Sequence, residues 1–232
     1  MAGVLPFPLL IAHKPEWRTY RFYNGADGPA RVARTGANAW DNDTCVDGDD
    51  VQQSNHWPVP GVHEGFRAGD VARHARLDRL RSVVVARLRT DRGRTRIPTC
   101  AEQLIEGKKH GVTPCFEIKT WTEAGLRRLK ADADAAGVPL VIMGQPGRVD
   151  ALRFGHEIGC VTILLTRGVV PADWGDFLTY AKGSAAACRG IPAVARLGTG
   201  PRNATAFGAG CNAANVRSVR RAVEREQREG VR

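Results

Sequence analysis

Short apolar runs rich in β-branched residues alternate along this chain with longer stretches whose apolar residues recur at helical spacing. Eight of the runs have the length and composition of buried strands: Phe7–Ala12, Ala37–Asp41, Thr113–Ile118, Val138–Met143, Cys160–Leu165, Asp176–Ala181, Ile191–Arg196 and Cys211–Ala214. Helices are predicted over four of the longer stretches: Cys100–His110, Arg148–Ile158, Glu123–Ala136 and Val216–Glu229. Strands that alternate with helices pair in parallel, so the pattern predicts an α/β fold.

The stretch Glu123–Ala136 shows how a helix is inferred. Leu126, Leu129 and Ala133 recur every three or four residues, which places them on one face of a helix. Gly137 follows at the position where a left-handed residue commonly ends a helix. This stretch is therefore predicted to be a helix with one buried face.

The strands are apolar over their whole length, as in Val161–Leu165, which is typical of a parallel sheet covered on both faces. Eight strand–helix units in 232 residues match the size of a small (β/α)₈ barrel of the TIM type, so residues 1–232 are predicted to form one domain. An open, doubly wound sheet is the alternative. Residues 58–96 are rich in Arg, Gly and His and interrupt the alternation, so we expect an insertion after the second strand, over the barrel mouth.

Composition excludes several classes of protein. With 43% hydrophobic and 25% charged residues the chain is not of the disordered type. Its 6 cysteines show no metal-finger spacing, so neither a zinc site nor a disulfide scaffold is expected. The apolar run Val4–Ala12 is too short to span a bilayer and lacks the features of a signal peptide, so we expect no transmembrane segment and a cytoplasmic location.

The net charge of +10 permits partners that carry phosphate, such as lipids, polymers or nucleic acid. The Arg-rich end of the chain, residues 217–232, alternates with glutamates and keeps helical spacing of valines. It is therefore interpreted as a helix with a solvated charged face, and nucleic acid is not the expected partner. Oligomeric state is left open.

Three carboxylates are predicted to meet at one end of the barrel. Asp41 and Asp43 are two residues apart near the end of a strand, so their side chains point to the same face. Glu117 lies near the end of the next strand, and the carboxyl ends of parallel barrel strands share one rim. Carboxylates this close repel one another unless a cation neutralises them, and oxygen ligands suit Mg²⁺, Ca²⁺ or Mn²⁺. Solvated loop carboxylates are the alternative.

Five short motifs follow one another in a fixed order. They are Leu10-Ile11-Ala12-His13-Lys14, Gly36-Ala37-Asn38-Ala39-Trp40-Asp41-Asn42-Asp43, Asp47-Gly48 followed by His56, Ile97-Pro98-Thr99-Cys100-Ala101-Glu102, and Glu117-Ile118-Lys119. Together they resemble the glycerophosphodiester phosphodiesterases. The closing strand of that family is weakly similar to Phe207-Gly208-Ala209-Gly210-Cys211, so the resemblance runs in register over most of the chain, with specific motifs only in its first half. The chain departs from the family pattern at Lys14 (Arg in the family), Asp41 (Glu) and Trp57 (Asp), as in a divergent member.

The resemblance implies a (β/α)₈ barrel that hydrolyses a phosphodiester with two histidines and one divalent cation, Mg²⁺ or Ca²⁺. It implies that His13 and His56 form an acid–base pair and that Lys14 and Lys119 bind the substrate phosphate. Asp41, Asp43 and Glu117 would hold the metal. The expected substrate is a glycerophosphodiester or related alkyl phosphodiester of lipid metabolism. The alternative is a weak or inactive barrel that binds a phosphate-rich polymer or serves as an interaction scaffold.

Overall fold

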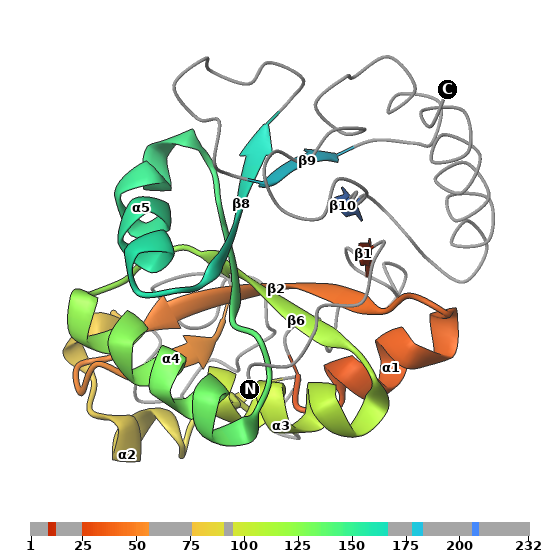
Figure 1. Cartoon of the computed structure of the whole chain (residues 1–232). Helices are drawn as coiled ribbons and strands as arrows, with labels where there is room; N and C mark the ends of the chain where they lie inside the picture. The colour runs from red at the N-terminus through yellow and green to blue at the C-terminus, as the bar shows by residue number, and fades with distance from the viewer. Residues whose placement is uncertain are drawn as a thin grey trace, which may run out of the picture.

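The computed structural model describes residues 9–12, 25–55, 76–90, 95–166, 178–182 and 206–208, and the account below concerns these residues. Seven parallel strands among them form a ring: β1 (Leu9–Ala12), β2 (Ala39–Val46), β6 (Thr113–Ile118), β7 (Val141–Gly144), β8 (Val161–Thr166), β9 (Leu178–Lys182) and β10 (Ala206–Gly208). The ring closes because β1 pairs in parallel with both β10 and β2 (Figure 1). The predicted parallel barrel is therefore confirmed, and closure excludes the open-sheet alternative.

Several strand boundaries shift by one to three residues from the predictions, and the largest difference is in the second strand. The second strand was predicted to end at Asp41, but β2 continues to Val46 through Asn42, Asp43 and Thr44. These polar residues stay in the strand because all of β2 from Asp41 to Thr44 pairs with β6. The ring is completed by β10. The pattern of apolar runs did not predict it, although it overlaps the segment Phe207–Cys211 that weakly resembles the closing strand of the family. The predicted strands Ile191–Arg196 and Cys211–Ala214 lie outside the described residues.

Helices cover the outside of the barrel: α1 (Gly28–Thr35), α3 (Cys100–His110), α4 (Glu123–Ala136) and α5 (Val149–Glu157). The ends of α3 are set locally, since Thr99 and Glu102 cap each other's backbone N–H groups at its start and Gly111, with φ of 64°, follows its end. Both α3 and α4 have the predicted bounds, and α5 is one residue shorter at each end. The predicted helix Val216–Glu229 lies outside the described residues.

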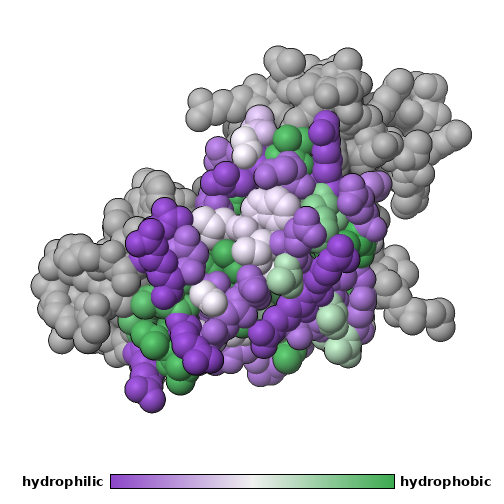
Figure 2. Space-filling view, turned by 90° about the vertical axis from the view of Figure 1, so that its left-hand side faces the viewer, coloured by the Kyte–Doolittle hydropathy of each residue, from purple (hydrophilic) through white to green (hydrophobic). Residues whose placement is uncertain are grey.

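Two apolar layers lie on opposite sides of the strands. The interior of the ring is filled by the side chains of Ile11, Ala39, Cys115, Val141, Met143, Ile163 and Leu165. The outer layer joins Phe116, Ile118 and Ile142 to residues of α3, α4 and α5, such as Leu104, Leu126 and Leu152. The surface that α4 and α5 turn to solvent is mostly hydrophilic (Figure 2). None of the described helices has the length and apolar character needed to cross a membrane.

The chain after β2 forms a small substructure beside the carboxyl-terminal half of that strand. It contains β3 (Gln52–Ser54), antiparallel to β2, the 3₁₀ turn η2 (Leu77–Arg79), the short helix α2 (Ser82–Val85), and a hairpin of β4 (Arg89–Thr90) and β5 (Thr95–Arg96). Leu77, Val85, Leu88 and Ile97 pack on Cys45 of β2. The described part of the predicted insertion thus follows the second strand. That it covers the barrel mouth stays a prediction.

Candidate metal centre

Three buried carboxylates lie together inside the barrel. Asp41 and Asp43 follow Ala39 at intervals of two along β2, and Glu117 follows Cys115 in the same way along β6, so all three point into the ring with those core residues. Asp43 is the pairing partner of Glu117 in the β2–β6 ladder. One carboxylate oxygen from each residue lies within 4.8 Å of the others. The structure therefore brings together the three acidic residues that the sequence predicted to meet near the ends of neighbouring strands.

Lys119 places one positive charge against this cluster. Its Nζ lies 2.9 Å from Oδ1 of Asp43 and also contacts Oε1 of Glu117. The backbone N–H of Lys119 donates to the carbonyl of Thr44, which extends the β2–β6 ladder and keeps Lys119 on the same side as Glu117. Among the described residues, Lys119 thus brings one positive charge to three buried carboxylates.

The electrostatic environment moves the pKa values of Glu117 and Lys119 upward. Burial, followed by repulsion from Asp41 and Asp43, raises the pKa of Glu117 despite the opposing effect of Lys119. Burial alone would lower the pKa of Lys119, but the carboxylates of Asp43 and Glu117 outweigh it and raise that pKa. Lys119 therefore stays charged at neutral pH, while Glu117 holds its proton to a higher pH than an ordinary glutamate.

Gln145 joins the site, although sequence reasoning missed it. It directly follows β7, the strand next to β6, and its Nε2 donates to Oε1 of Glu117 at 3.2 Å. The signal that could have found it is its position, since it is the first polar side chain after a predicted strand and lies at the same rim as Glu117. Lys119 and Gln145 together fix one oxygen of Glu117.

Asp47, in the Asp47-Gly48 turn, organises the chain that leaves β2. Its Oδ1 accepts the backbone N–H groups of Asp49 and Val51 at 2.9 and 3.0 Å, and its Oδ2 accepts from Gln53 Nε2 at 2.7 Å and Ser82 Oγ at 2.6 Å. The carboxylate is 2% exposed. Asp47 therefore joins the turn to β3 and to the start of α2.

Replacing Asp47 with Ala should destabilise the fold by about 3–5 kcal/mol, because four donors to a buried carboxylate lose their acceptor at once. Thermal unfolding monitored by circular dichroism measures the loss. Asp49→Ala is the matched control: it changes the next acidic residue of the turn, which is only partly buried, and should destabilise the fold much less. Equal effects of the two substitutions would contradict a special role for Asp47.

The remaining predicted residues, His13, Lys14, His56 and Trp57, lie outside the described residues. The structure does describe the residue before each histidine. Ala12, which precedes His13, pairs with Trp40, which precedes Asp41. Asn55, which precedes His56, is buried and follows β3.

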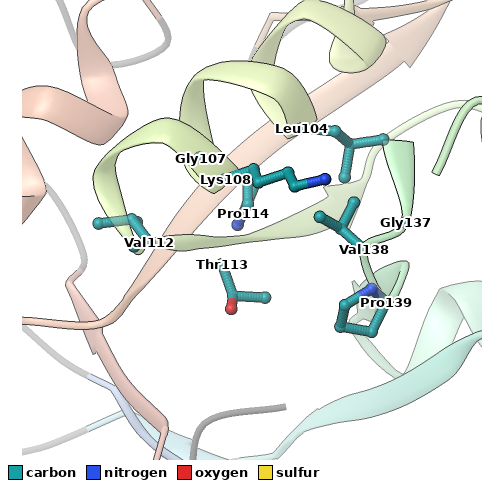
Figure 3. A pocket seen from close by; sticks show the side chains of 10 residues that line it. Leu104, Gly107, Lys108, Val112, Thr113, Pro114, Gly137, Val138 and Pro139 are labelled. Atoms are coloured by element: carbon teal, nitrogen blue, oxygen red, sulfur yellow. The ribbon is translucent and has the colours of Figure 1, made fainter. Parts of the chain in front are cut away.

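A cavity of about 350 Å³ lies at the amino-terminal ends of β6 and β7, opposite to the end that carries the acidic cluster (Figure 3). Thr113, the first residue of β6, and Pro139, just before β7, line it together with apolar side chains such as Leu104 and Val138. Glu117 and Gln145 lie at the other ends of these strands. The cavity is therefore not part of the acidic site.

No model of a known protein family matches the sequence, and no curated protein matches it. Solved structures do match. A glycerophosphodiester phosphodiesterase from Parabacteroides distasonis superposes with a TM-score of 0.62 at 13% identity, over 93% of this chain and 96% of that one. A phosphodiesterase from Oleispira antarctica, in complex with its product sn-glycerol-3-phosphate, superposes with a TM-score of 0.53 at 11% identity, over 94% of this chain and 97% of that one.

The chain has the fold of the glycerophosphodiester phosphodiesterases. The resemblance noted from short sequence motifs is therefore confirmed at the level of the fold. Within that fold the acidic cluster lies toward the carboxyl ends of β2 and β6, the end at which barrel enzymes of this architecture carry their active sites.

Proposed function

We propose that this protein is a metal-dependent phosphodiesterase that hydrolyses a glycerophosphodiester or a related alkyl phosphodiester. The observation that carries the proposal is the buried cluster of Asp41, Asp43 and Glu117, with Lys119 against it, inside a barrel with the glycerophosphodiester phosphodiesterase fold. The product bound to the Oleispira antarctica enzyme supports a substrate with a glycerol phosphate group.

The donor set fits a hard divalent cation. All three candidate ligands are carboxylates, which suit Mg²⁺, Ca²⁺ or Mn²⁺ rather than a softer metal. Their convergence within 4.8 Å in a buried position is unfavourable for ionised groups, and a divalent cation would relieve the repulsion. When bound, such a cation supplies positive charge that offsets the charge of a phosphodiester and of its transition state.

Lys119 and Gln145 have separate roles in this proposal. Lys119 stays protonated because of Asp43 and Glu117, and its side chain is 19% exposed, so its ammonium can also interact with a phosphoryl oxygen. Gln145 holds the carboxylate of Glu117 in place through its amide. Lys14 would add a second positive charge, as the family resemblance implies.

His13 and His56 would carry the proton transfers. Hydrolysis of a phosphodiester requires that a nucleophile lose a proton and that the leaving alkoxide gain one, and imidazole titrates near neutral pH. The pairing of Ala12 with Trp40 supports a place for His13 beside Asp41, since each residue directly follows one of that pair. Either water or a neighbouring hydroxyl of the substrate would be the nucleophile.

The test is an assay of the purified protein on glycerophosphodiesters, lysophospholipids, polymer-like phosphodiesters and bis-aryl phosphodiesters, with one divalent metal at a time. We expect release of product with Mg²⁺ or Ca²⁺ and loss of activity in EDTA. Activity that survives thorough chelation would contradict the metal site. Tight binding of a phosphate polymer without turnover of any substrate would instead favour the non-catalytic alternative.

Metal binding should weaken as the pH falls through the raised pKa of Glu117. A carboxyl group with a raised pKa holds its proton to a higher pH, and the metal must displace that proton to use the oxygen. Isothermal titration of Mg²⁺ or Mn²⁺ at a series of pH values measures this dependence. Glu117→Gln removes the titrating group and should flatten the dependence. A metal affinity that stays constant as the pH falls to the pKa range of ordinary glutamates would contradict the role of Glu117 as a metal ligand with a raised pKa.

A further inference from the structure

The short helix α2 and the residues around it expose apolar side chains to solvent. Val83 is 57% exposed and Val84 39% exposed, and among the described residues only Ile105 joins them as an exposed large hydrophobic side chain. The inner side of the same segment is occupied, since Leu77 and Val85 are buried against Cys45. The fold therefore fixes this segment from the inside and leaves two adjacent valines on its outer side.

Arginines flank these valines along the chain. Four lie exposed within residues 76–88: Arg76, Arg79, Arg81 and Arg87. Arg76 pairs with Asp78, the one acidic residue of that segment, and Arg81 pairs with Asp49. For Arg79 and Arg87 the described part of the chain shows no ion pair. Within residues 76–88 the surface thus combines exposed apolar side chains with four arginines and one acidic residue.

This surface is held at the same end of the barrel as the acidic cluster. Ser82 donates from its backbone N–H to Asp49 Oδ2 at 2.8 Å and from its hydroxyl to Asp47 Oδ2 at 2.6 Å. The backbone N–H of Gly48 donates to the carbonyl of Leu80 at 2.8 Å. Asp47 and Gly48 directly follow the carboxyl end of β2, the strand that carries Asp43, and Figure 1 shows α2 below the arrowhead of that strand.

We propose that the outer surface of residues 76–88 docks on an anionic lipid bilayer, with Val83 and Val84 entering the head-group region and the arginines contacting lipid phosphates. The inference rests on the proposed function for its substrate, which would be the phosphodiester of a lipid head group. Two valines offer far less apolar contact than a stable protein interface requires. A bilayer adds charge attraction to a small apolar insertion, and this surface offers both.

Vesicle co-sedimentation tests the docking surface. The wild-type protein should bind phosphatidylcholine vesicles that contain phosphatidylglycerol and should bind pure phosphatidylcholine much more weakly, with a strong dependence on salt. Val83→Ser with Val84→Ser should weaken binding about tenfold, and Arg79→Gln with Arg87→Gln should weaken it by about fivefold per arginine. Ile105→Ser and Arg128→Gln make the same chemical changes at exposed positions of α3 and α4 and should leave binding unchanged.

Hydrolysis assays on soluble and on membrane-held substrates distinguish docking from catalysis. The α2 variants should hydrolyse a water-soluble glycerophosphodiester at the wild-type rate and lose activity only on a lysophospholipid held in anionic vesicles. Equal losses on both substrates, failure of the wild type to bind vesicles, or concentration-dependent self-association abolished by the valine substitutions would each overturn the proposal. Vesicle binding with the expected variant pattern, but no hydrolysis of any substrate, would support the docking surface and refute the proposed function.

Discussion

Replacing Glu117 with Gln should lower turnover at least about a hundredfold, because the substitution removes one of three anionic ligands while keeping the size of the side chain. Metal affinity should fall with it. The metal-free protein should be as stable as the wild type or more so, since the neutral amide would replace the buried charge that Asp41 and Asp43 repel. Lys119 keeps its ion pair with Asp43 in the variant.

Thermal melts with and without Mg²⁺, run beside the assay, measure these effects. A metal that binds only the folded protein raises the melting temperature of the wild type, and the shift should shrink or vanish in the variant. Glu157→Gln is the matched control: it makes the same change at an exposed position at the end of α5 and should retain both activity and the shift. A Glu117→Gln protein that unfolds without metal would instead show that the carboxylate supports the fold.

The elements that the sequence predicted best have their signals close together in the chain. The start and end of α3 follow from Thr99, Glu102 and Gly111, all within one turn of the helix termini, and α4 begins after Thr122, whose hydroxyl caps it. Apolar strands such as β8 were predicted for a similar reason, because burial on both faces leaves a continuous apolar run. Local patterning was therefore sufficient for most of the barrel.

The elements that the sequence did not predict depend on distant partners. β3 consists of Gln52, Gln53 and Ser54, which have no apolar pattern, yet all three are buried. Gln53 forms an antiparallel bridge with Thr99, and the backbone N–H of Ser54 donates to the carbonyl of Pro98 at 2.9 Å. Only the fold brings these partners together, so single-sequence periodicity could not place this strand.

The candidate site also has features that the local sequence predicts and features that only the fold determines. The spacing of Asp41 and Asp43, and their relation to Glu117, follow from strand geometry and were predictable before the fold was known. The contacts of Lys119 with both Asp43 and Glu117, and that of Gln145 with Glu117, depend on the register of β2, β6 and β7. The extension of β2 past Asp41 was missed because polar residues usually mark the end of a strand. Here Asp43 points into the barrel beside Glu117, while Asn42 and Thr44 alternate to the other face and bond to Ser54 and Gln52 of β3.

Replacing His13 with Ala should lower turnover by about two to four orders of magnitude, the usual contribution of a positioned acid or base. Metal affinity should change little, because the proposed ligands are the carboxylates of Asp41, Asp43 and Glu117. The melting temperature of the metal-bound protein should also stay close to the wild-type value. Steady-state kinetics over a range of pH, calorimetric metal titration and a thermal melt of the same preparation measure these three quantities.

His156→Ala is the control for this substitution, since His156 lies exposed on α5, a helix outside the barrel, and should tolerate the change with turnover near the wild-type rate. Loss of a proton-transfer group has a further signature: the pH profile of kcat should lose one limb, and added imidazole should restore part of the rate. A His13→Ala enzyme with full activity and an unchanged profile would remove His13 from the mechanism. If Glu117→Gln then also unfolds the metal-free protein, both residues serve the fold and the phosphodiesterase proposal fails.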